Sequence, residues 1–281
     1  MPDFLCRPCR KFRISFPPER RFPQGVFHVK TLILTLAACL LLAGSVQARI
    51  SQGKDVTSSP DKYFSTNEEG LDSLAVLPPP PAFDSLQFQH DRAMYEQGLT
   101  LRSGPRGDMA RLDAESPKVA GSLSEAFGCP ITAETTPVLF GLIGRLRGEL
   151  GDMACRTAKK KYFRTRPYVL YNASTCYPPD EERLRGNGSY PSGHSARGWA
   201  VALLLSEINP GRKELILKRG YEMGQSRVIC GYHWQSDVDA GRLAGAAAVA
   251  QLHANRTFCS LLQQAKDEFA VLAREGRVLT K

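Results

Sequence analysis

The chain contains 281 residues, 42% of them hydrophobic and 23% charged, a composition that is ordinary for a globular protein and indicates a soluble, folded domain. Its net charge of +9 first suggests nucleic-acid binding, but residues 1–48 hold seven Lys/Arg against two Asp/Glu and supply +5 of that charge. The other residues carry +4 and, apart from Lys159–Lys161, have no basic tract interleaved with aromatic residues. The sequence therefore disfavours a nucleic-acid partner.

Residues 1–48 have the pattern of an export leader. Lys30 precedes an apolar run over residues 31–44, and the small residues of Val46-Gln47-Ala48 then fit the positions that a signal peptidase reads. The run has no polar face, which disfavours a core helix, and it is too short to span a bilayer as a stable anchor. We predict a secretory signal peptide, cleavage near Arg49, and a periplasmic or secreted mature protein without a stable membrane anchor.

Two details of this leader have alternative interpretations. Cys39 resembles a lipoprotein site, but the apolar run continues beyond it, where a mature lipoprotein turns polar, so we do not expect a lipid there. Residues 1–28 are rich in Arg, Pro and Phe. An over-extended gene start, with Val29 as the true initiator, explains them better than a twin-arginine export signal at Arg20-Arg21.

Residues 49–82 form the expected N-terminal arm, in which Pro78–Pro81 is a short, stiff polyproline segment. Residues 83–281 form the expected domain, in which apolar residues recur at helical spacing and convincing strand alternation is absent. The predicted fold is all-α: a single helical domain with a helical-bundle core, preceded by the signal peptide and the irregular proline-containing arm. Its most apolar stretches, 199–205 and 243–252, are too short to span a membrane.

Capping residues and prolines set the bounds of the predicted helices. The first helix has Pro137 in its opening turn and extends to Arg166, because Pro167 discourages continuation. The expected bounds are 135–166, 191–209, 213–229, 238–253 and 257–274.

Lys159 and Arg166 lie seven residues apart, which is close to two helical turns. On one continuous helix they would project from the same face and bind one anion together. A solvated basic face is the alternative interpretation, and we accept that alternative for Lys160, Lys161 and Arg164.

Pro191-Ser192-Gly193-His194 places a glycine, which lets a ligand approach the backbone, at the start of a helix. The free N–H groups and the positive dipole end of such a helix favour an anion, and Ser192 adds a hydroxyl donor. An ordinary helix cap with a chance histidine is the alternative for this motif taken alone.

Ser226-Arg227 is followed after five residues by His233, and Asp237 lies four beyond that histidine. A histidine and an aspartate at this spacing can share a helical face. The carboxylate then keeps one ring nitrogen protonated, so that the other points outward as a nucleophile. A surface hydrogen-bonded pair is the alternative.

His194, His233 and Asp237 are also residue types that bind a catalytic metal. A site that also gathered the three basic residues of these motifs would repel a cation and attract a multiply charged anion such as phosphate. The set therefore favours an oxyanion, and no metal is expected.

Three motifs occur together in one chain without a substitution: Lys-x6-Arg-Pro, then Pro-Ser-Gly-His, then Ser-Arg-x5-His-x3-Asp. In this order they resemble the signature of the type 2 phosphatidic acid phosphatase and vanadium haloperoxidase superfamily. Within it, the stretches GSYPSGH, NPGRKELILKRGYEMGQSRVICGYHWQSDVDAGR and LPPPPAFDS are similar to those of the bacterial class A non-specific acid phosphatases. The resemblance extends from about Leu77 to the C-terminus.

This resemblance implies a secreted acid phosphatase that hydrolyses a broad range of phosphate monoesters, including nucleotides, sugar phosphates and aryl phosphates, through a phosphohistidine intermediate. The implied catalytic residues are His233, which attacks phosphorus, Asp237, which orients it, and His194, which protonates the leaving alcohol and then activates water. The implied phosphate-binding residues are Lys159, Arg166, Ser192, Gly193 and Arg227. The family also implies a homodimer or higher homo-oligomer, no cofactor and no metal requirement.

Three alternatives remain beside this interpretation. A vanadium haloperoxidase would hold vanadate where a phosphatase holds phosphate, and a halide-oxidation assay would separate the two. A non-catalytic phosphate-binding protein would need neither His194 nor His233. A lipid-phosphate phosphatase would require membrane helices, which the mature sequence lacks.

The cysteines after the leader, at positions 129, 155, 176, 230 and 259, can form disulfides in an oxidising compartment, and their odd number leaves at least one free. Cys176 follows Arg166 by ten residues and Cys230 precedes His233 by three, so a bond between them would tie two active-site segments together. We predict this pair, with Cys129–Cys155 as the second pair and Cys259 free.

Overall fold

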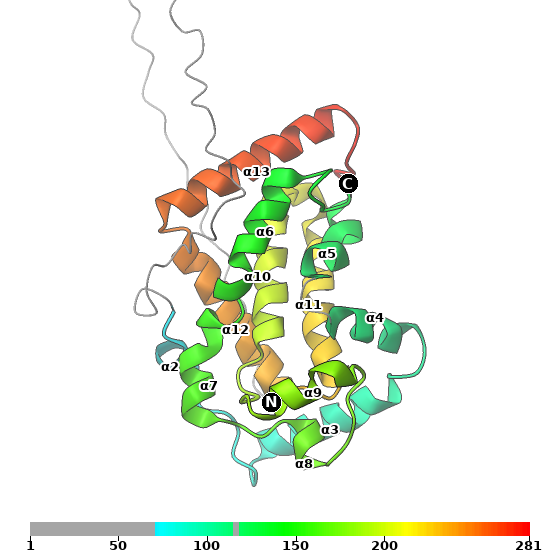
Figure 1. Cartoon of the computed structure of the whole chain (residues 1–281), viewed down its shortest axis with the longest axis vertical. Coiled ribbons are helices and arrows are strands. Elements are labelled where there is room, and N and C mark those ends of the chain that lie inside the picture. The colour runs from blue at the N-terminus through cyan, green and yellow to red at the C-terminus, as the bar shows by residue number, and fades with distance from the viewer. Residues whose placement is uncertain (1–70, 115–117) are drawn as a thin grey trace, which may run out of the picture. The chain divides into compact units, whose positions relative to one another are not determined.

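Helices form the regular structure of residues 71–114 and 118–281, the part of the chain described by a computed structural model (Figure 1). They are α2 (Ser73–Val76), α3 (Leu86–Thr100), α4 (Pro105–Ala114), α5 (Val119–Phe127), α6 (Pro137–Glu149), α7 (Arg156–Tyr162), α8 (Pro167–Leu170), α9 (Glu181–Arg185), α10 (Gly193–Ile208), α11 (Lys213–Ile229), α12 (Gln235–Leu252) and α13 (Arg256–Arg274). Short 3-10 turns are η2 (Met153–Cys155), η3 (Pro178–Asp180) and η4 (Pro210–Arg212). No strand occurs in the described ranges, so the all-α prediction is confirmed. The expected signal peptide and the first part of the expected arm, up to residue 70, lie outside them.

The centre of the bundle is α10, which packs against both α11 and α12. Figure 1 shows α10 and α11 side by side along the bundle, with α13 across one end. Two glycines permit this close packing. A Cβ at Gly220 would lie 2.3 Å from the side chain of Ala202, and a Cβ at Gly245 would lie 2.3 Å from the carbonyl oxygen of Ala196. Either substitution would push α11 or α12 away from α10.

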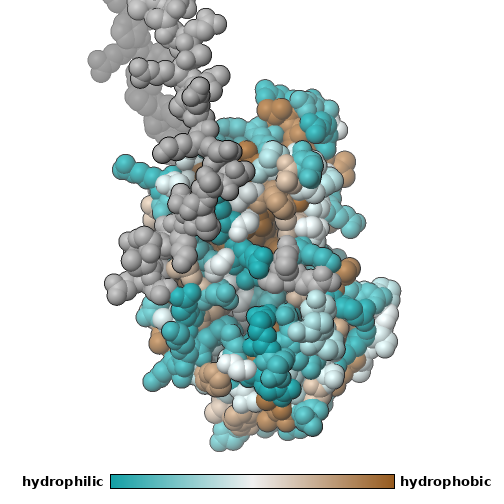
Figure 2. Space-filling view, viewed as in Figure 1, coloured by the Kyte–Doolittle hydropathy of each residue, from teal (hydrophilic) through white to brown (hydrophobic). Residues whose placement is uncertain are grey.

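The main hydrophobic core draws on α5, α6, α10, α11 and α13. Its fully buried side chains include Leu123, Phe127, Leu146, Leu205 and Phe258. Burial of each contributes about 1.5–3 kcal/mol relative to exposure, which outweighs the weak intrinsic preference of single helices. Hydrophilic residues cover most of the face seen in Figure 2, with hydrophobic residues in small groups between them. None of the described helices is long and apolar enough to cross a bilayer.

Local sequence signals set the bounds of the two central helices. The Ser192 side chain caps α10 by accepting from Ser195 N, and α10 ends at Ile208, before Asn209-Pro210. The prediction for residues 191–209 and that for 213–229 are confirmed. Helix α12 begins at Gln235, three residues before the predicted bound, and α13 begins one residue early.

The single helix predicted over residues 135–166 is wrong. Helix α6 ends at Glu149, a 3-10 turn follows, and α7 ends at Tyr162. Gly151 falls in the break, where a Cβ would lie 2.3 Å from the Arg197 guanidinium, so the chain passes too close for a side chain. Phe163 adopts a left-handed conformation with φ of 40°, which terminates α7. Lys159 and Arg166 therefore do not share a helix.

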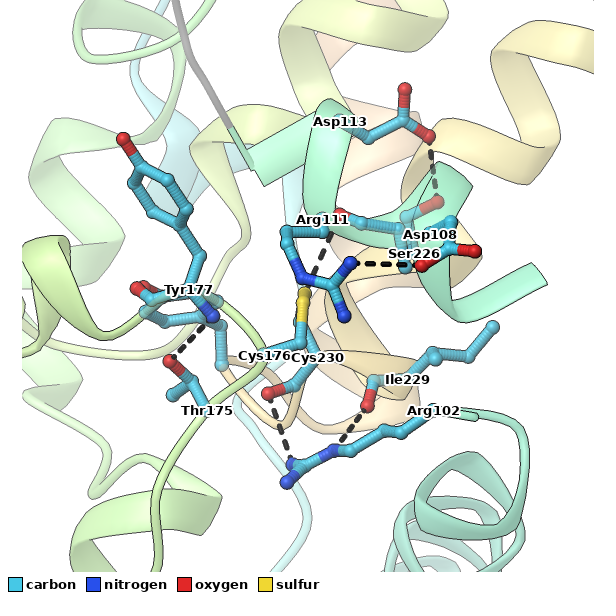
Figure 3. The surroundings of a disulfide bond; sticks show 12 residues. Arg102, Asp108, Arg111, Asp113, Thr175, Cys176, Tyr177, Ser226, Ile229 and Cys230 are labelled. Atoms are coloured by element: carbon cyan, nitrogen blue, oxygen red, sulfur yellow. Dashed lines mark hydrogen bonds and ion pairs between the residues drawn. A yellow bond between two sulfur atoms is a disulfide. The ribbon is translucent and has the colours of Figure 1, made fainter. Parts of the chain in front are cut away.

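A disulfide joins Cys176, in the segment before η3, to Cys230, which caps the end of α11, as predicted (Figure 3). Figure 3 also shows Arg102 donating hydrogen bonds to the carbonyl oxygens of Ile229 and Cys230, so several contacts fix this end of α11. The predicted Cys129–Cys155 pair is wrong. These cysteines are buried as free thiols in two different hydrophobic clusters, while Cys259 is free, as predicted.

We expect the double variant Cys176→Ser, Cys230→Ser to lose about 3–4 kcal/mol of unfolding free energy, because the bond closes a loop with a sequence separation of 54 residues. Denaturant unfolding without reductant measures this loss. Cys259→Ser is the matched control, since Cys259 forms no disulfide, and it should change the free energy by less than about 0.5 kcal/mol. Equal stability of the double variant and the parent would contradict the bond.

Candidate active site

A cavity of about 600 Å³ lies at the end of the bundle where α10 begins. Its lining includes five of the eight predicted site residues: Lys159, Arg166, Gly193, His194 and His233. The other three, Ser192, Arg227 and Asp237, are fully buried. The first turns of α10 and α12 are joined by a backbone hydrogen bond of 2.8 Å from Ser192 N to Asp237 O. Residues far apart in the sequence thus form one site.

His233 lies just before α12, not within it. The expectation that His233 and Asp237 share a helical face is therefore wrong, although the two side chains do meet. The Nε2 atom of His233 is 3.1 Å from Nη1 of Arg166. Because a guanidinium has no acceptor, it donates this hydrogen bond, so Nε2 carries the lone pair and Nδ1 carries the proton. Nδ1 lies 3.3 Å from Oγ of Ser189 and 3.5 Å from Oδ2 of Asp237.

The Asp237 carboxylate is held from three sides. Its Oδ2 accepts hydrogen bonds from Trp234 N at 2.8 Å and from the Ser189 hydroxyl at 2.5 Å. Its Oδ1 accepts from Arg164 at 2.6 Å. The carboxylate is thus fixed beside Nδ1 of His233, where it can retain the ring proton.

Arg164 is not the solvated residue that we predicted. Its side chain is 5% exposed and forms ion pairs with both Asp91 and Asp237. Asp91 comes from α3 and belongs to none of the three motifs. It shares the buried face of α3 with Phe88 and Tyr95, and a carboxylate at that helical spacing is the signal that could have indicated it from the sequence.

Two buried groups beside the cavity have no hydrogen-bond partner within the described residues: the guanidinium of Arg227, through all three nitrogens, and Nε2 of His194. The Arg227 guanidinium lies over the ring of Tyr232, with 4.3 Å from Cζ to the ring centroid. Removing one partner of a buried ion pair costs roughly 3–5 kcal/mol, because the other charge is left unpaired. An unpaired buried guanidinium has a cost of the same order. An anion in the cavity would remove that cost.

Charge and burial together set the protonation of the two histidines. Burial lowers the pKa of His194 well below its usual value, and the positive charges of Arg227 and Arg197 lower it further. Burial, followed by Arg166 and Lys159, has the same effect on the pKa of His233. Both rings are therefore neutral in the empty cavity at neutral pH. Nε2 of His233 then carries no proton and accepts only the hydrogen bond from Arg166.

Lys159 and Arg166 are oriented by backbone carbonyl oxygens. Nζ of Lys159 donates to Gly188 O at 2.8 Å, and Nε of Arg166 donates to Leu184 O at 3.0 Å and Asn187 O at 2.9 Å. The structure brings these two cations to one cavity from α7 and from the residue before α8, so the predicted pairing holds although the predicted helix does not.

Ser192 and Gly193 form the helix terminus that the motif predicted. Oγ of Ser192 accepts from Ser195 N at 3.3 Å and from Ser195 Oγ at 2.9 Å, which leaves the hydroxyl hydrogen of Ser192 for another acceptor. Gly193 also has a packing role, because a Cβ there would lie 3.2 Å from the carbonyl oxygen of Gly151. The N-terminus of the long helix α10 faces the cavity and favours an anion.

The sequence interpretation missed several lining residues, namely Arg147, Gly148, Asp152, Tyr177, Asp180, Arg183, Leu184, Asn187 and Arg197. Tyr177 directly follows the disulfide-bonded Cys176, so the bond predicted from the sequence was the signal that this loop reaches the site. In the described ranges, no three His, Cys, Asp or Glu side chains gather in an arrangement that could hold a metal ion.

Comparison with known proteins shows the family of the chain. Residues 142–258 match the model of the PAP2 superfamily. A non-specific acid phosphatase of Providencia stuartii is 52% identical over 248 residues, which cover 88% of this chain and 100% of that protein. One of Salmonella typhimurium is 44% identical over 73% of this chain and 83% of that protein, and an acid phosphatase of Zymomonas mobilis is 34% identical over 81% and 87%. The chain belongs to the class A non-specific acid phosphatases of the PAP2 superfamily.

In this acid phosphatase family member, Lys159 should make substrate capture depend on pH. Burial and the charge of Arg166 lower its pKa to about 8, so Lys159 is charged below that pH and neutral above it. An aryl phosphate is already a dianion above about pH 7. We therefore expect kcat/KM for an aryl phosphate to fall as the pH rises through about 8, because kcat/KM reports the free enzyme.

Lys159→Arg should retain kcat/KM to higher pH, since a guanidinium stays charged, and pH–rate profiles measure the difference. The exposed Lys160→Arg is the matched control and should leave the parent profile unchanged. A Lys159→Arg profile that falls at the same pH as the parent would assign the fall to another group.

Proposed function

We propose that the chain is an exported acid phosphatase that hydrolyses a broad range of phosphate monoesters through a phosphohistidine at His233. The observation that carries the proposal is the fully buried guanidinium of Arg227, unpaired within the described residues and beside a histidine pair that faces a cavity. A tetrahedral dianion supplies the acceptors that Arg227 lacks. Nucleotides, sugar phosphates and aryl phosphates share that group and differ only in the part that leaves.

The phosphate oxygens bind to the cations and to the start of α10. Lys159, Arg166 and Arg227 donate to them, together with the Ser192 hydroxyl and the Gly193 amide. These groups are held in place before substrate arrives, so they stabilise charge on the transferring phosphoryl group without reorganising. Carbonyl oxygens around Lys159 and Arg166 support this preorganisation.

In the first half-reaction, Nε2 of His233 attacks phosphorus, the P–Nε2 bond forms and the ester P–O bond breaks. His194 donates a proton to the leaving alcohol oxygen. Nδ1 of His233 keeps its proton, so the phosphorylated ring is cationic, and Asp237 offsets that charge. The separation of 3.5 Å between Nδ1 and the Asp237 carboxylate supports this role.

In the second half-reaction, His194 takes a proton from water, the water oxygen attacks phosphorus and the P–Nε2 bond breaks. Inorganic phosphate is released and His233 returns to its neutral form. An alcohol that replaces water at this step gives a new phosphate ester, so the same site would have phosphotransferase activity.

A vanadium haloperoxidase is the second candidate, because vanadate would satisfy Arg227 as phosphate does. Relatives named as acid phosphatases, one of them matched over 100% of its length, favour the phosphatase. Halide oxidation with added vanadate, in the absence of phosphatase activity, would favour the haloperoxidase. A non-catalytic phosphate-binding protein has no need for the neutral, cavity-facing His233, which disfavours that candidate.

Export and assembly belong to the same proposal. The leader pattern in residues 1–48 supports a mature protein that begins near Arg49, with an arm over 49–82 and a catalytic domain over 83–281. The disulfide supports an oxidising location such as the periplasm or the exterior. The proposed mature protein is a homodimer or larger homo-oligomer without a nucleic-acid partner or a stable membrane anchor.

His233→Ala should abolish turnover of every ester, because no phosphoenzyme can form. His194→Ala should reduce kcat most for alkyl phosphates, whose leaving groups need a proton, and least for aryl phosphates with acidic phenols. A series of esters of graded leaving-group pKa measures this difference. Equal losses across the series would show that His194 is not the general acid.

Acid-quenched His194→Ala should accumulate labelled phosphoenzyme, because hydrolysis of that intermediate also requires His194. The label should lie on His233. The exposed His90→Ala is the matched control and should keep parent kinetics. Label on a serine would contradict the mechanism.

A further inference from the structure

Buried charged side chains connect Asp237 to Asp91 of α3, a helix that lies outside all three sequence motifs. One guanidinium, that of Arg164, binds two carboxylates: its Nη1 lies 2.6 Å from Oδ1 of Asp237 and its Nη2 lies 2.7 Å from Oδ2 of Asp91. The three side chains are at most 5% exposed. This cluster contains one cation and two anions, so it carries a net charge of −1.

The contacts and burial of the cluster strengthen the electrostatic effect of its net charge. Ser236 bridges the two helices, since its N–H and hydroxyl donate to Asp91 at 2.8 and 2.6 Å. The Arg164 guanidinium lies beside the rings of Phe88 and Trp234, at 5.8 and 5.6 Å from their centroids. The low exposure of the three charged side chains removes most of their contact with water, so these charges interact more strongly than charges at the surface.

The remaining charges that face His233 are positive, from Arg166, Lys159 and Arg227. Asp237 is the carboxylate next to the ring, and Arg164 contacts it more closely than the ring does, at 2.6 Å against 3.5 Å. Arg164 alone would therefore cancel the charge of Asp237 as felt at His233. Asp91 pairs with the other side of the same guanidinium and restores the net negative charge.

We propose that Arg164 and Asp91 are positioning residues for phosphoryl transfer: Arg164 fixes the Asp237 carboxylate, and Asp91 offsets the charge of Arg164 so that Asp237 can stabilise the cationic phosphohistidine. In this phosphoryl transfer to His233, the P–Nε2 bond forms, the ester P–O bond breaks, and Nδ1 keeps its proton. The inference rests on the proposed function and assigns a role to an aspartate that precedes the residues matched by the PAP2 model.

The position of the pair separates this role from substrate binding. Neither Arg164 nor Asp91 lines the cavity, whereas Lys159 and Arg166 do. Loss of Asp91 should therefore lower kcat and leave the inhibition constant of inorganic phosphate nearly unchanged. A residue that merely stabilises the fold would change neither constant in the folded fraction.

The test compares Asp91→Asn with the double variant Asp91→Asn, Arg164→Gln in the full chain. Asp91→Asn brings the cluster to zero net charge, and we expect kcat for an aryl phosphate to fall about 10- to 100-fold. This loss is smaller than the roughly 100- to 1000-fold loss that follows removal of a group in direct contact with the reacting atoms. The double variant restores a charge of −1 but loses the ion pair that fixes Asp237. The recovery should therefore be partial, at least about a third of the loss in kcat on a logarithmic scale. Recovery by a second substitution is expected from charge compensation and not from lost packing.

Asp108→Asn is the matched control, because it makes the same chemical change in an exposed ion pair on α4 and should keep parent kcat. Thermal unfolding followed by circular dichroism establishes that each variant is folded. If Asp91→Asn does not fold, Arg164→Lys replaces it: one ammonium group cannot bind both carboxylates as the guanidinium fork does, so kcat should fall at least about fivefold with an unchanged phosphate inhibition constant.

Parent-like kcat in Asp91→Asn, a double variant slower than Asp91→Asn, or parent-like kcat in Arg164→Lys would overturn the inference. Failure of the proposed function is distinguishable, because it would appear in the parent protein as no phosphate release or no label on His233. An active parent with labelled His233 and an unaffected Asp91→Asn would reject the positioning role alone.

Discussion

The site depends on buried cations that are not fully paired with carboxylates. Arg227 is completely buried and has no hydrogen-bond partner in the described ranges, and Lys159 and Arg166 line the cavity near it. Such an arrangement destabilises the empty protein, since charges removed from water are stable only when paired. The bundle core offsets the cost, and a phosphate dianion removes it. Affinity for the anion and instability of the empty site therefore have the same origin.

Lys159 and Arg166 are held mainly by carbonyl oxygens, and such partners preserve the positive charge of both side chains. Gly188 O accepts from both Lys159 and Arg166, while Leu184 O and Asn187 O accept from Arg166. A carbonyl dipole satisfies an N–H group without supplying a full negative charge, so each cation is oriented but not neutralised. A carboxylate at the same position would orient the side chain equally well and compete with the phosphate. The backbone of the loop before α10 thus orients the two cations that we propose bind phosphate.

The sequence predicted the elements whose signals are local. Proline, asparagine and capping serine set the bounds of α10. The family resemblance of the three motifs supplied the eight proposed site residues, five of which line one cavity. Ion pairs between residues far apart in the sequence could not be predicted from such local signals. Arg164 was taken for a solvated residue because its two partners, Asp91 and Asp237, lie 73 residues away in each direction. The helix over 135–166 failed because local periodicity does not register the close approach of Arg197 at Gly151.

In the proposed mechanism, the positive charges that bind phosphate also set the protonation state of His194, the proposed general acid. Burial and the charges of Arg227 and Arg197 lower the pKa of His194, so in the empty cavity it is neutral and cannot donate the proton required at the leaving group. A phosphate dianion places two negative charges against those arginines and opposes their effect on His194. The proposed function thus couples protonation of His194 to substrate binding. The hydrogen bond that Arg166 donates to Nε2 of His233 keeps the proton of that ring on Nδ1. In the proposed mechanism, His233 therefore serves as the nucleophile while His194 becomes the acid.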